Sequence, residues 1–333
     1  MAPHERPPDP QPKATSITHT KETILRAFGE LVPLATAEDI TRLLFTKGSK
    51  AYVRSVMTAL AGGADAQKNQ YLYRFGMPQA PGNFERLYTL GRRGRDFLRS
   101  LGMTAHWWYR PHKASSFSFL QHHHFVAQFI VSLYAFCRIC PDLRVRETRN
   151  GFAMAANPPR LTMPSDGPDT TITVIPDAWM YLEASSGEDW ALWIEIDTGS
   201  EGKAKFQQLT LDRINFIRYK GYEAYFGVPA VLVCYLAVGM TTQHRLARLH
   251  TIRQWTAEVL AEQKLADWAA HFRFSTIDEC LYDTLMHLTD PVWYLPDADT
   301  LVPLFPSSQD QEEARGTSPT TDLSCVDCQT LLP

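Results

Sequence analysis

The segments TTITVIPDAWMYLE at residues 170–183 and DWALWIEIDTGSEGKAKF at residues 189–206 decide the fold. Each contains a run rich in β-branched and aromatic residues, which favour strands, and the turn sequence ASSGE separates the two runs. The pattern therefore predicts two adjacent strands joined as a hairpin, with Pro176 and Asp177 inside the first of them. The glycine-containing end of the second segment predicts a turn before the next helix.

Further helices and strands alternate around this hairpin. We expect a helix at about 116–140, a strand at 142–149, a helix at 201–220, a strand at 228–238, a helix at 241–263 and a strand at 271–276. The continuously apolar run VPAVLVCYLAV is typical of a central strand that is buried on both faces. The order of elements predicts an α/β domain with a mixed sheet over residues 121–296.

Three carboxylates are the candidate chemical site of this domain. Glu195 and Asp197 lie two residues apart on one strand, so their side chains share a face, and the hairpin brings Asp177 within reach of it. Carboxylate oxygens are hard ligands, so the trio predicts a site for Mg²⁺ or Mn²⁺. Such an ion would activate water and hold a phosphodiester. The alternative is that these are polar residues of a degenerate core without catalytic activity.

The N-terminal part predicts a winged helix-turn-helix over residues 21–103. Apolar residues at helical spacing indicate helices at 21–33, from Thr36 to Phe45 and at 49–61, with the turn TKGS before the third. Two short strand-like runs, LYRFGM and ERLYTL, follow as a wing.

Basic residues of this part are the candidate DNA contacts, because lysine and arginine neutralise phosphates and release counterions. They lie on the turn and third helix and on the helix after the wing: Lys47, Lys50, Arg54, Arg92, Arg93 and Arg95. The alternative is that the three helices and hairpin form a dimerisation or protein-docking module.

Charged residues are distributed unevenly along the chain of 333 residues. Residues 1–113 hold 17 lysines and arginines against 9 acidic residues, whereas the whole chain has a net charge of −3. A basic first third and an acidic remainder suggest that one end meets a polyanion. Composition predicts a disordered leader at 1–20, a linker at 104–120 and a disordered tail at 297–333. Neither a secretory signal nor a membrane span is expected, which favours the cytoplasm.

The order of elements, with PD and then E-x-D, resembles the PD-(D/E)xK nuclease core. Together with TILRAFGELVPLATAEDITRLLF at 23–45, LYTLGRRGRDFLRSLG at 87–102, PDAWMYLE at 176–183 and IEIDTGSEGKAKFQQL at 194–209, it resembles the replication-relaxation family over about residues 21–275. The resemblance implies a DNA-binding protein of a plasmid or mobile element that acts in replication, relaxation or transfer. Its partners would be double-stranded DNA and a replication or transfer protein; the oligomeric state is not indicated.

The nuclease resemblance implies Asp177, Glu195, Asp197 and a lysine as catalytic residues, with Mg²⁺ or Mn²⁺ on the carboxylates. Asp197, however, occupies the position of the motif lysine. Lys205 is our candidate to replace it by reaching back from the next helix, with Lys203 as second choice. The rival interpretation is a non-catalytic DNA-binding regulator or adaptor whose α/β domain is a protein-interaction module.

Overall fold

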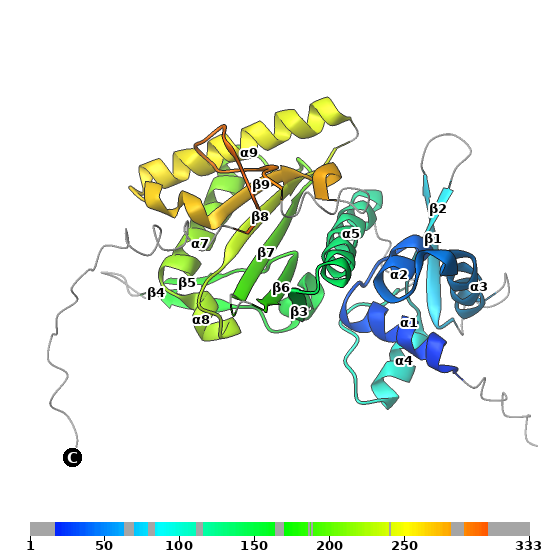
Figure 1. The fold of residues 1–333 in the computed structure, drawn as a ribbon. Coiled ribbons are helices and arrows are strands. Elements are labelled where there is room, and N and C mark those ends of the chain that lie inside the picture. The colour runs from blue at the N-terminus through cyan, green and yellow to red at the C-terminus, as the bar shows by residue number, and fades with distance from the viewer. Residues whose placement is uncertain are drawn as a thin grey trace, which may run out of the picture. The chain divides into compact units, whose positions relative to one another are not determined.

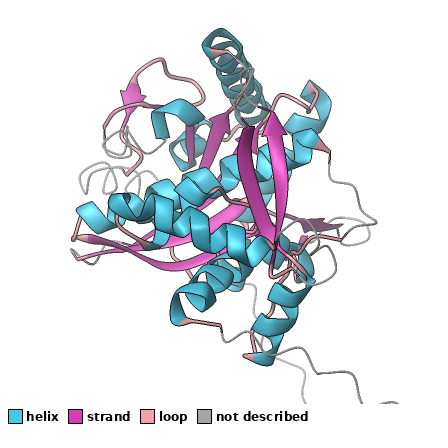
Figure 2. Cartoon of the chain, turned by 90° about the vertical axis from the view of Figure 1, so that its right-hand side faces the viewer, coloured by secondary structure: helices cyan, strands magenta, loops and turns pink. Residues whose placement is uncertain are grey.

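The structure, a computed structural model, describes residues 17–62, 70–78, 84–110, 116–163, 170–185, 187, 189–239, 241–280 and 290–305. The chain divides into two units, Met1–Val131 and Ser132–Pro333 (Figure 1). Both units combine helices with strands (Figure 2). The division falls inside helix α5 (Phe117–Ile139), beyond the segment 104–120 that the sequence marked as a linker.

The first unit places a set of short helices against a hairpin. Its described part contains α1 (His19–Glu30), α2 (Ala37–Leu44), the 3₁₀ turn η1 (Lys47–Ser49), α3 (Lys50–Ala61), β1 (Leu72–Pro78), β2 (Phe84–Leu90) and α4 (Arg92–Ser100). β1 and β2 pair antiparallel, and Ala35 forms an isolated bridge with Tyr88 on β2. The sequence predicts Val53, Val56, Met57 and Leu60 as the core stripe of the third helix; Val53, Met57 and Leu60 are buried, and Val56 is half-buried.

Helix α2 begins with a capping box that is also tied to α5. The Thr36 hydroxyl accepts from the backbone N–H of Asp39 at 3.1 Å, and Asp39 Oδ2 accepts from the Thr36 N–H at 2.7 Å. His124 Nε2 of α5 donates to the same Oδ2 at 3.1 Å. Asp39 is fully buried, so these donors replace the water that the carboxylate gives up.

The predicted linker is packed against the hairpin where the structure describes it. The Tyr109 N–H donates to the Leu90 carbonyl at 2.8 Å, and the Tyr109 ring stacks on Tyr73 with 3.4 Å between centroids. The guanidinium of Arg95 lies 4.1 Å from the centroid of Trp108. Residues 104–110 therefore belong to the fold of the first unit.

The second unit is built on a mixed sheet, as the sequence predicts. Among the described residues, seven strands form it in the order β11-β10-β9-β8-β7-β6-β3. Their bounds are β3 (Leu143–Asn150), β6 (Ala178–Ala184), β7 (Asp189–Asp197), β8 (Leu232–Ala237), β9 (Phe272–Thr276), β10 (Trp293–Tyr294) and β11 (Leu301–Val302). β7, β8 and β9 are parallel, and the remaining neighbours pair antiparallel.

Helices α7 (Lys203–Arg218) and α9 (Thr242–Glu262) are the crossovers between the parallel strands. Their apolar residues share one core with the side chains of β7, β8 and β9. Smaller elements complete the described part of the unit: α6 (Gly151–Ala156), α8 (Gly221–Phe226), η2 (Ala266–His271) and η3 (Ile277–Cys280). The face of β7 that carries Trp193 and Glu195 therefore lies under these crossover helices.

The first predicted strand of the hairpin, 170–183, is two strands. β5 (Thr170–Thr173) pairs with β4 (Arg160–Met163) in a separate sheet, and β6 begins only at Ala178. Pro176 lacks the N–H that a central strand would have to donate, which accounts for the break. The prediction that Asp177 lies inside a strand is wrong, since it directly precedes β6.

Part of the predicted disordered tail is ordered. β11 lies within residues 297–305, and Leu304 is fully buried. Buried Arg253 donates to the carbonyls of Leu295 and Ala298, and buried Arg273 donates to that of Pro303 at 3.2 Å. These bonds hold the segment against α9 and β9; residues 306–333 lie outside the described residues.

Candidate functional site

Glu195 and Asp197 sit near the carboxyl end of β7, on the same face, as the sequence predicts. Both are 8% exposed. Asp177 accepts a hydrogen bond at Oδ2 from the Ile196 N–H at 2.8 Å, which fixes it beside the same strand. The negative charge of Asp177 also raises the pKa of Glu195, so these two carboxyls are electrostatically coupled.

Glu195 is paired with a buried arginine from α7. Arg213 donates to Glu195 Oε1 from Nε at 3.0 Å and from Nη2 at 2.9 Å, and Trp193 Nε1 donates to the same oxygen at 2.5 Å. Burial raises the pKa of Glu195 to about 7, although the guanidinium works against the rise. Arg213 also donates to the Tyr235 hydroxyl at 2.9 Å, so one network links α7, β7 and β8.

Asp197 is held by a second arginine, from α9. Arg248 Nε donates to Asp197 Oδ1 at 2.6 Å and Nη2 donates to Oδ2 at 2.9 Å, which is the bidentate geometry of the strongest ion pairs. The Gly199 N–H donates to Oδ1 at 2.9 Å, and Arg248 also donates to the Glu201 carbonyl. Gly199 adopts φ +74°, a left-handed conformation that suits this tight turn.

The candidate lysines lie on the surface of α7, away from these carboxylates. Lys205 forms an ion pair with Glu201 at 2.6 Å, and its side chain is 68% exposed. Lys203 pairs with Glu258 at 2.8 Å. Neither lysine folds back over the strand end, and the cations that contact Glu195 and Asp197 are arginines instead.

This donor set does not fit the Mg²⁺ or Mn²⁺ site that the sequence predicts. Within the described ranges, no group of three or more His, Cys, Asp or Glu side chains is placed to hold a metal ion. The guanidinium groups of Arg213 and Arg248 stand against the carboxylate oxygens that would be ligands. A divalent cation would have to displace both of them from buried ion pairs.

In the first unit, the predicted DNA contacts near α3 differ in their availability. The side chains of Lys47 and Arg54 are exposed and make no hydrogen bond or ion pair within the part of the chain that the structure describes. Lys50 forms an ion pair with Glu38 of α2. Burial raises the pKa of Glu38, but the charges of Lys50 and Arg42 outweigh it, so this pKa lies below its usual value.

The predicted contacts on α4 are mostly engaged inside the unit. Arg93 donates to the Tyr71 hydroxyl at 3.1 Å and lies over its ring, and Arg95 pairs with Asp96 at 2.5 Å while it stacks on Trp108. Arg92 is the exception, with a 74% exposed side chain that lies 3.9 Å from Asp96. α4 also packs closely on β1, because a Cβ on Gly94 would lie 2.2 Å from the Tyr71 carbonyl oxygen.

Two exposed arginines of the hairpin were missed in the sequence. Arg74 on β1 pairs with Tyr88, and Arg86 on β2 pairs with Gly76, so the two arginines project from the same face of the hairpin. Both are exposed and make no ion pair among the described residues. Alternation with Tyr73 and Phe75 was the available signal, since it places Arg74 on the opposite face from these aromatic rings.

Comparison with protein families matches residues 29–228 to the family described as replication-relaxation, which covers well over half of the chain. The match includes α2, α3, α4 and the hairpin of the first unit and the Glu195–Arg213 pair, whereas most of α1 precedes it and Arg248 follows it. Neither the comparison with curated proteins nor that with solved structures found a match. In the described residues, no helix combines the length and the hydropathy that crossing a membrane requires.

Proposed function

The chain belongs to the replication-relaxation family, and from this premise we propose that it binds duplex DNA of a plasmid or mobile element during replication, relaxation or transfer. The observation that carries the proposal is a set of exposed cations without internal partners. They lie on the turn before α3, on α3 and on the hairpin: Lys47, Arg54, Arg74 and Arg86.

Unpaired surface cations favour a polyanionic ligand. An arginine or lysine that already has a carboxylate partner gains little from a phosphate, because it must give up that partner. The four cations give up no carboxylate partner on binding, and each phosphate that they neutralise releases a condensed counterion. The order of α2, the turn, α3 and the hairpin supports the proposal of a winged helix-turn-helix, in which the third helix would enter the major groove.

For the second unit, the structure favours the regulator or adaptor over the nuclease. Two of the three carboxylates proposed to hold a metal, Glu195 and Asp197, are paired with Arg213 and Arg248, and Lys205 lies on the helix surface. A divalent ion at this strand end would have to compete with two guanidinium groups for its ligands, which disfavours the nuclease. We therefore propose that this unit binds a partner protein of the replication or transfer machinery.

DNA binding is tested by a titration of the full chain with duplex DNA at several salt concentrations. The variant Arg74→Ala/Arg86→Ala should bind more weakly, and its slope of log affinity against log salt should shrink by about two units. The matched control, Lys203→Ala/Lys205→Ala, removes the same charge from the second unit and should leave both quantities unchanged. An equal effect of the two variants would mean that only net charge matters.

The nuclease alternative is tested with supercoiled and linear DNA in the presence of Mg²⁺ or Mn²⁺. We expect no cleavage by the unmodified chain. Cleavage that disappears in Asp177→Ala would contradict the adaptor proposal and restore the catalytic role of Asp177, Glu195 and Asp197. The variant Lys205→Ala would then decide whether this lysine acts in the reaction.

A further inference from the structure

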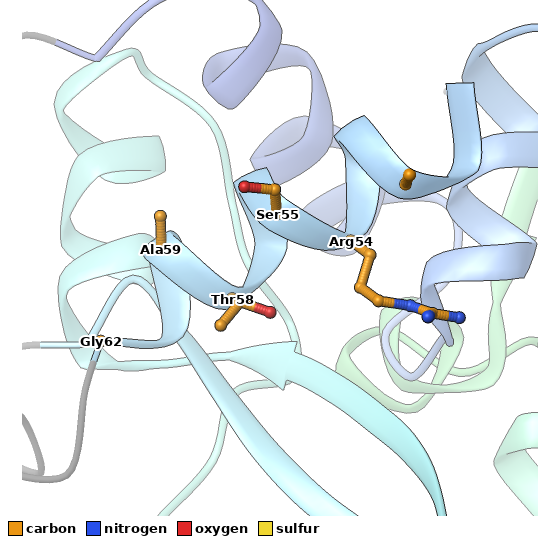
Figure 3. A pocket seen from close by; sticks show the side chains of 6 residues that line it. Arg54, Ser55, Thr58, Ala59 and Gly62 are labelled. Carbon is orange, nitrogen blue, oxygen red and sulfur yellow. The ribbon is translucent and has the colours of Figure 1, made fainter. Parts of the chain in front are cut away.

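Helix α3 carries an open hollow on its exposed face. Its volume is about 530 Å³, and it is lined by Ala51, Arg54, Ser55, Thr58, Ala59 and Gly62 (Figure 3). Apart from the arginine, every lining side chain is small. The helix backbone can therefore come unusually close to a ligand along this face, and Arg54 is the one long side chain of the lining that would meet it.

The dimensions of the duplex suit such a helix face. The major groove of B-DNA is about 12 Å wide and about 8.5 Å deep, so it admits an α-helix. Bulky side chains would keep the helix axis away from the base edges, and beside Arg54 the lining offers only small ones, such as Ala51 and Ala59, with the exposed Tyr52 next to them on the same helix. Helix α3 ends at Ala61, and Gly62, its C-cap with φ +72°, is the last lining residue of the hollow.

Arg54 differs from its neighbour Lys50 in what it can still bind. The ammonium group of Lys50 pairs with Glu38, whereas the guanidinium of Arg54 makes no hydrogen bond or ion pair in the described part of the chain. Its guanidinium presents parallel N–H groups in a fixed plane, which match two acceptors side by side. Guanine shows such a pair, N7 and O6, in the major groove.

Building on the proposed DNA binding, we infer that the hollow takes the major-groove edge of a base pair and that Arg54 reads a guanine there. The hydroxyls of Ser55 and Thr58 are neutral and serve either bases or phosphates, so they discriminate less than a bidentate arginine. Arg74 and Arg86 of the hairpin contact the phosphate backbone, which holds the helix in register without reading sequence.

The inference makes Arg54 a determinant of specificity rather than of general affinity. The full chain is first used to enrich duplexes from a pool of random sequence. Dissociation constants are then measured at one salt concentration for the enriched duplex, for a shuffled duplex and for versions in which single guanines are replaced. The specificity ratio is the affinity for the enriched duplex divided by that for the shuffled one.

Arg54→Ala should lower the specificity ratio by about 5- to 150-fold, the usual effect of one bidentate arginine–guanine contact. Replacement of the guanine should affect the wild type and leave Arg54→Ala unaffected. Arg54→Lys should keep the affinity for the shuffled duplex while it loses the ratio, because it keeps the charge without the planar fork. Ala59→Gln should also lower the ratio by filling the hollow.

The control Arg74→Ala/Arg86→Ala should weaken both duplexes alike and preserve the ratio. A wild type without sequence preference, or an Arg54→Ala variant with an unchanged ratio, overturns the inference while DNA binding stands. A uniform loss on both duplexes in Arg54→Ala assigns this residue to a phosphate and also overturns it. Failure of the wild type to bind any duplex removes the proposed function as well.

Discussion

Arginine has opposite environments in the two units. Arg54, Arg74 and Arg86 of the first unit point to solvent without internal partners in the described residues. Arg213 and Arg253 of the second unit are 8% exposed and are satisfied by carboxylates and backbone carbonyls. The arginines of the first set are available to an external anion, whereas those of the second set already bind groups inside the protein.

This contrast teaches that the position of a charge matters more than the charge balance of its region. The acidic second unit still holds buried cations, because Glu195 and Asp197 need them. The basic first unit also holds arginines that serve its own packing, such as Arg93 on Tyr71. Counting charges along the sequence identified the basic unit but not which of its arginines are free.

The largest expected effect is on stability, in the second unit. Arg213→Met should lower the free energy of unfolding by about 3–5 kcal/mol, because Glu195 would stay buried without its cation. Urea denaturation followed by tryptophan fluorescence measures this. In the double variant Arg213→Met/Glu195→Gln most of the loss should be recovered, since no charge is then left unpaired. If the free energy of unfolding of Arg213→Met lay within about 1 kcal/mol of that of the wild type, Arg213 would not stabilise the second unit as described.

The second prediction concerns pH and the same buried pair. The folded-state pKa of Glu195, about 7, lies above the usual value of a glutamate, so the folded state holds this proton more tightly. The stability that this group contributes is therefore full below about pH 4 and falls as pH rises towards 7, by on the order of 3 kcal/mol. Denaturation curves across this range should show the fall in the wild type and not in Glu195→Gln. A parallel profile for both proteins would contradict it.

A smaller effect is expected for the arginines of α4. Arg95→Ala should lower the free energy of unfolding by about 1 kcal/mol, because it removes the stacking on Trp108 and the pair with Asp96. Its affinity for duplex DNA should stay near that of the wild type, which a binding titration checks. If Arg95→Ala lost affinity for duplex DNA without losing stability, Arg95 would be a DNA contact, as the sequence predicts.

The smallest effect on stability is expected for the exposed arginines of the hairpin in the first unit. Arg74→Ala/Arg86→Ala should change the free energy of unfolding by less than about 0.5 kcal/mol, because neither side chain has an internal partner to lose. Thermal denaturation beside the wild type is sufficient to measure this. A clear destabilisation would show that the hairpin arginines serve the fold, and the DNA effect of this variant would then need another explanation.

Features that depend on neighbouring residues were predictable from the sequence. The apolar spacing of Val53, Met57 and Leu60 predicted the buried face of α3, and strand alternation placed Glu195 and Asp197 on one face of β7. The order of strands and crossover helices predicted a mixed α/β sheet. In each case the pattern lies within one element or follows from the succession of elements.

The partners of those side chains were not predictable in the same way. Arg213 is 18 residues from Glu195 in the sequence, and Arg248 is 51 residues from Asp197. Their pairing depends on which turn of each crossover helix lies over the strand end, and short motifs do not encode this register. Nearness in sequence favours Lys205 as the replacement cation, but its position on α7 directs it to Glu201 instead.

The hydrogen bond between Asp39 and His124 determines where a separately expressed fragment of the N-terminal unit should end. A fragment ending at residue 103, where the sequence predicts the end of the winged helix, would keep the fully buried carboxylate and discard the imidazole that bonds it. It would also uncover Leu34 and Leu87, against which Leu120 packs. An isolated DNA-binding fragment should therefore extend to about Val131, where the unit ends.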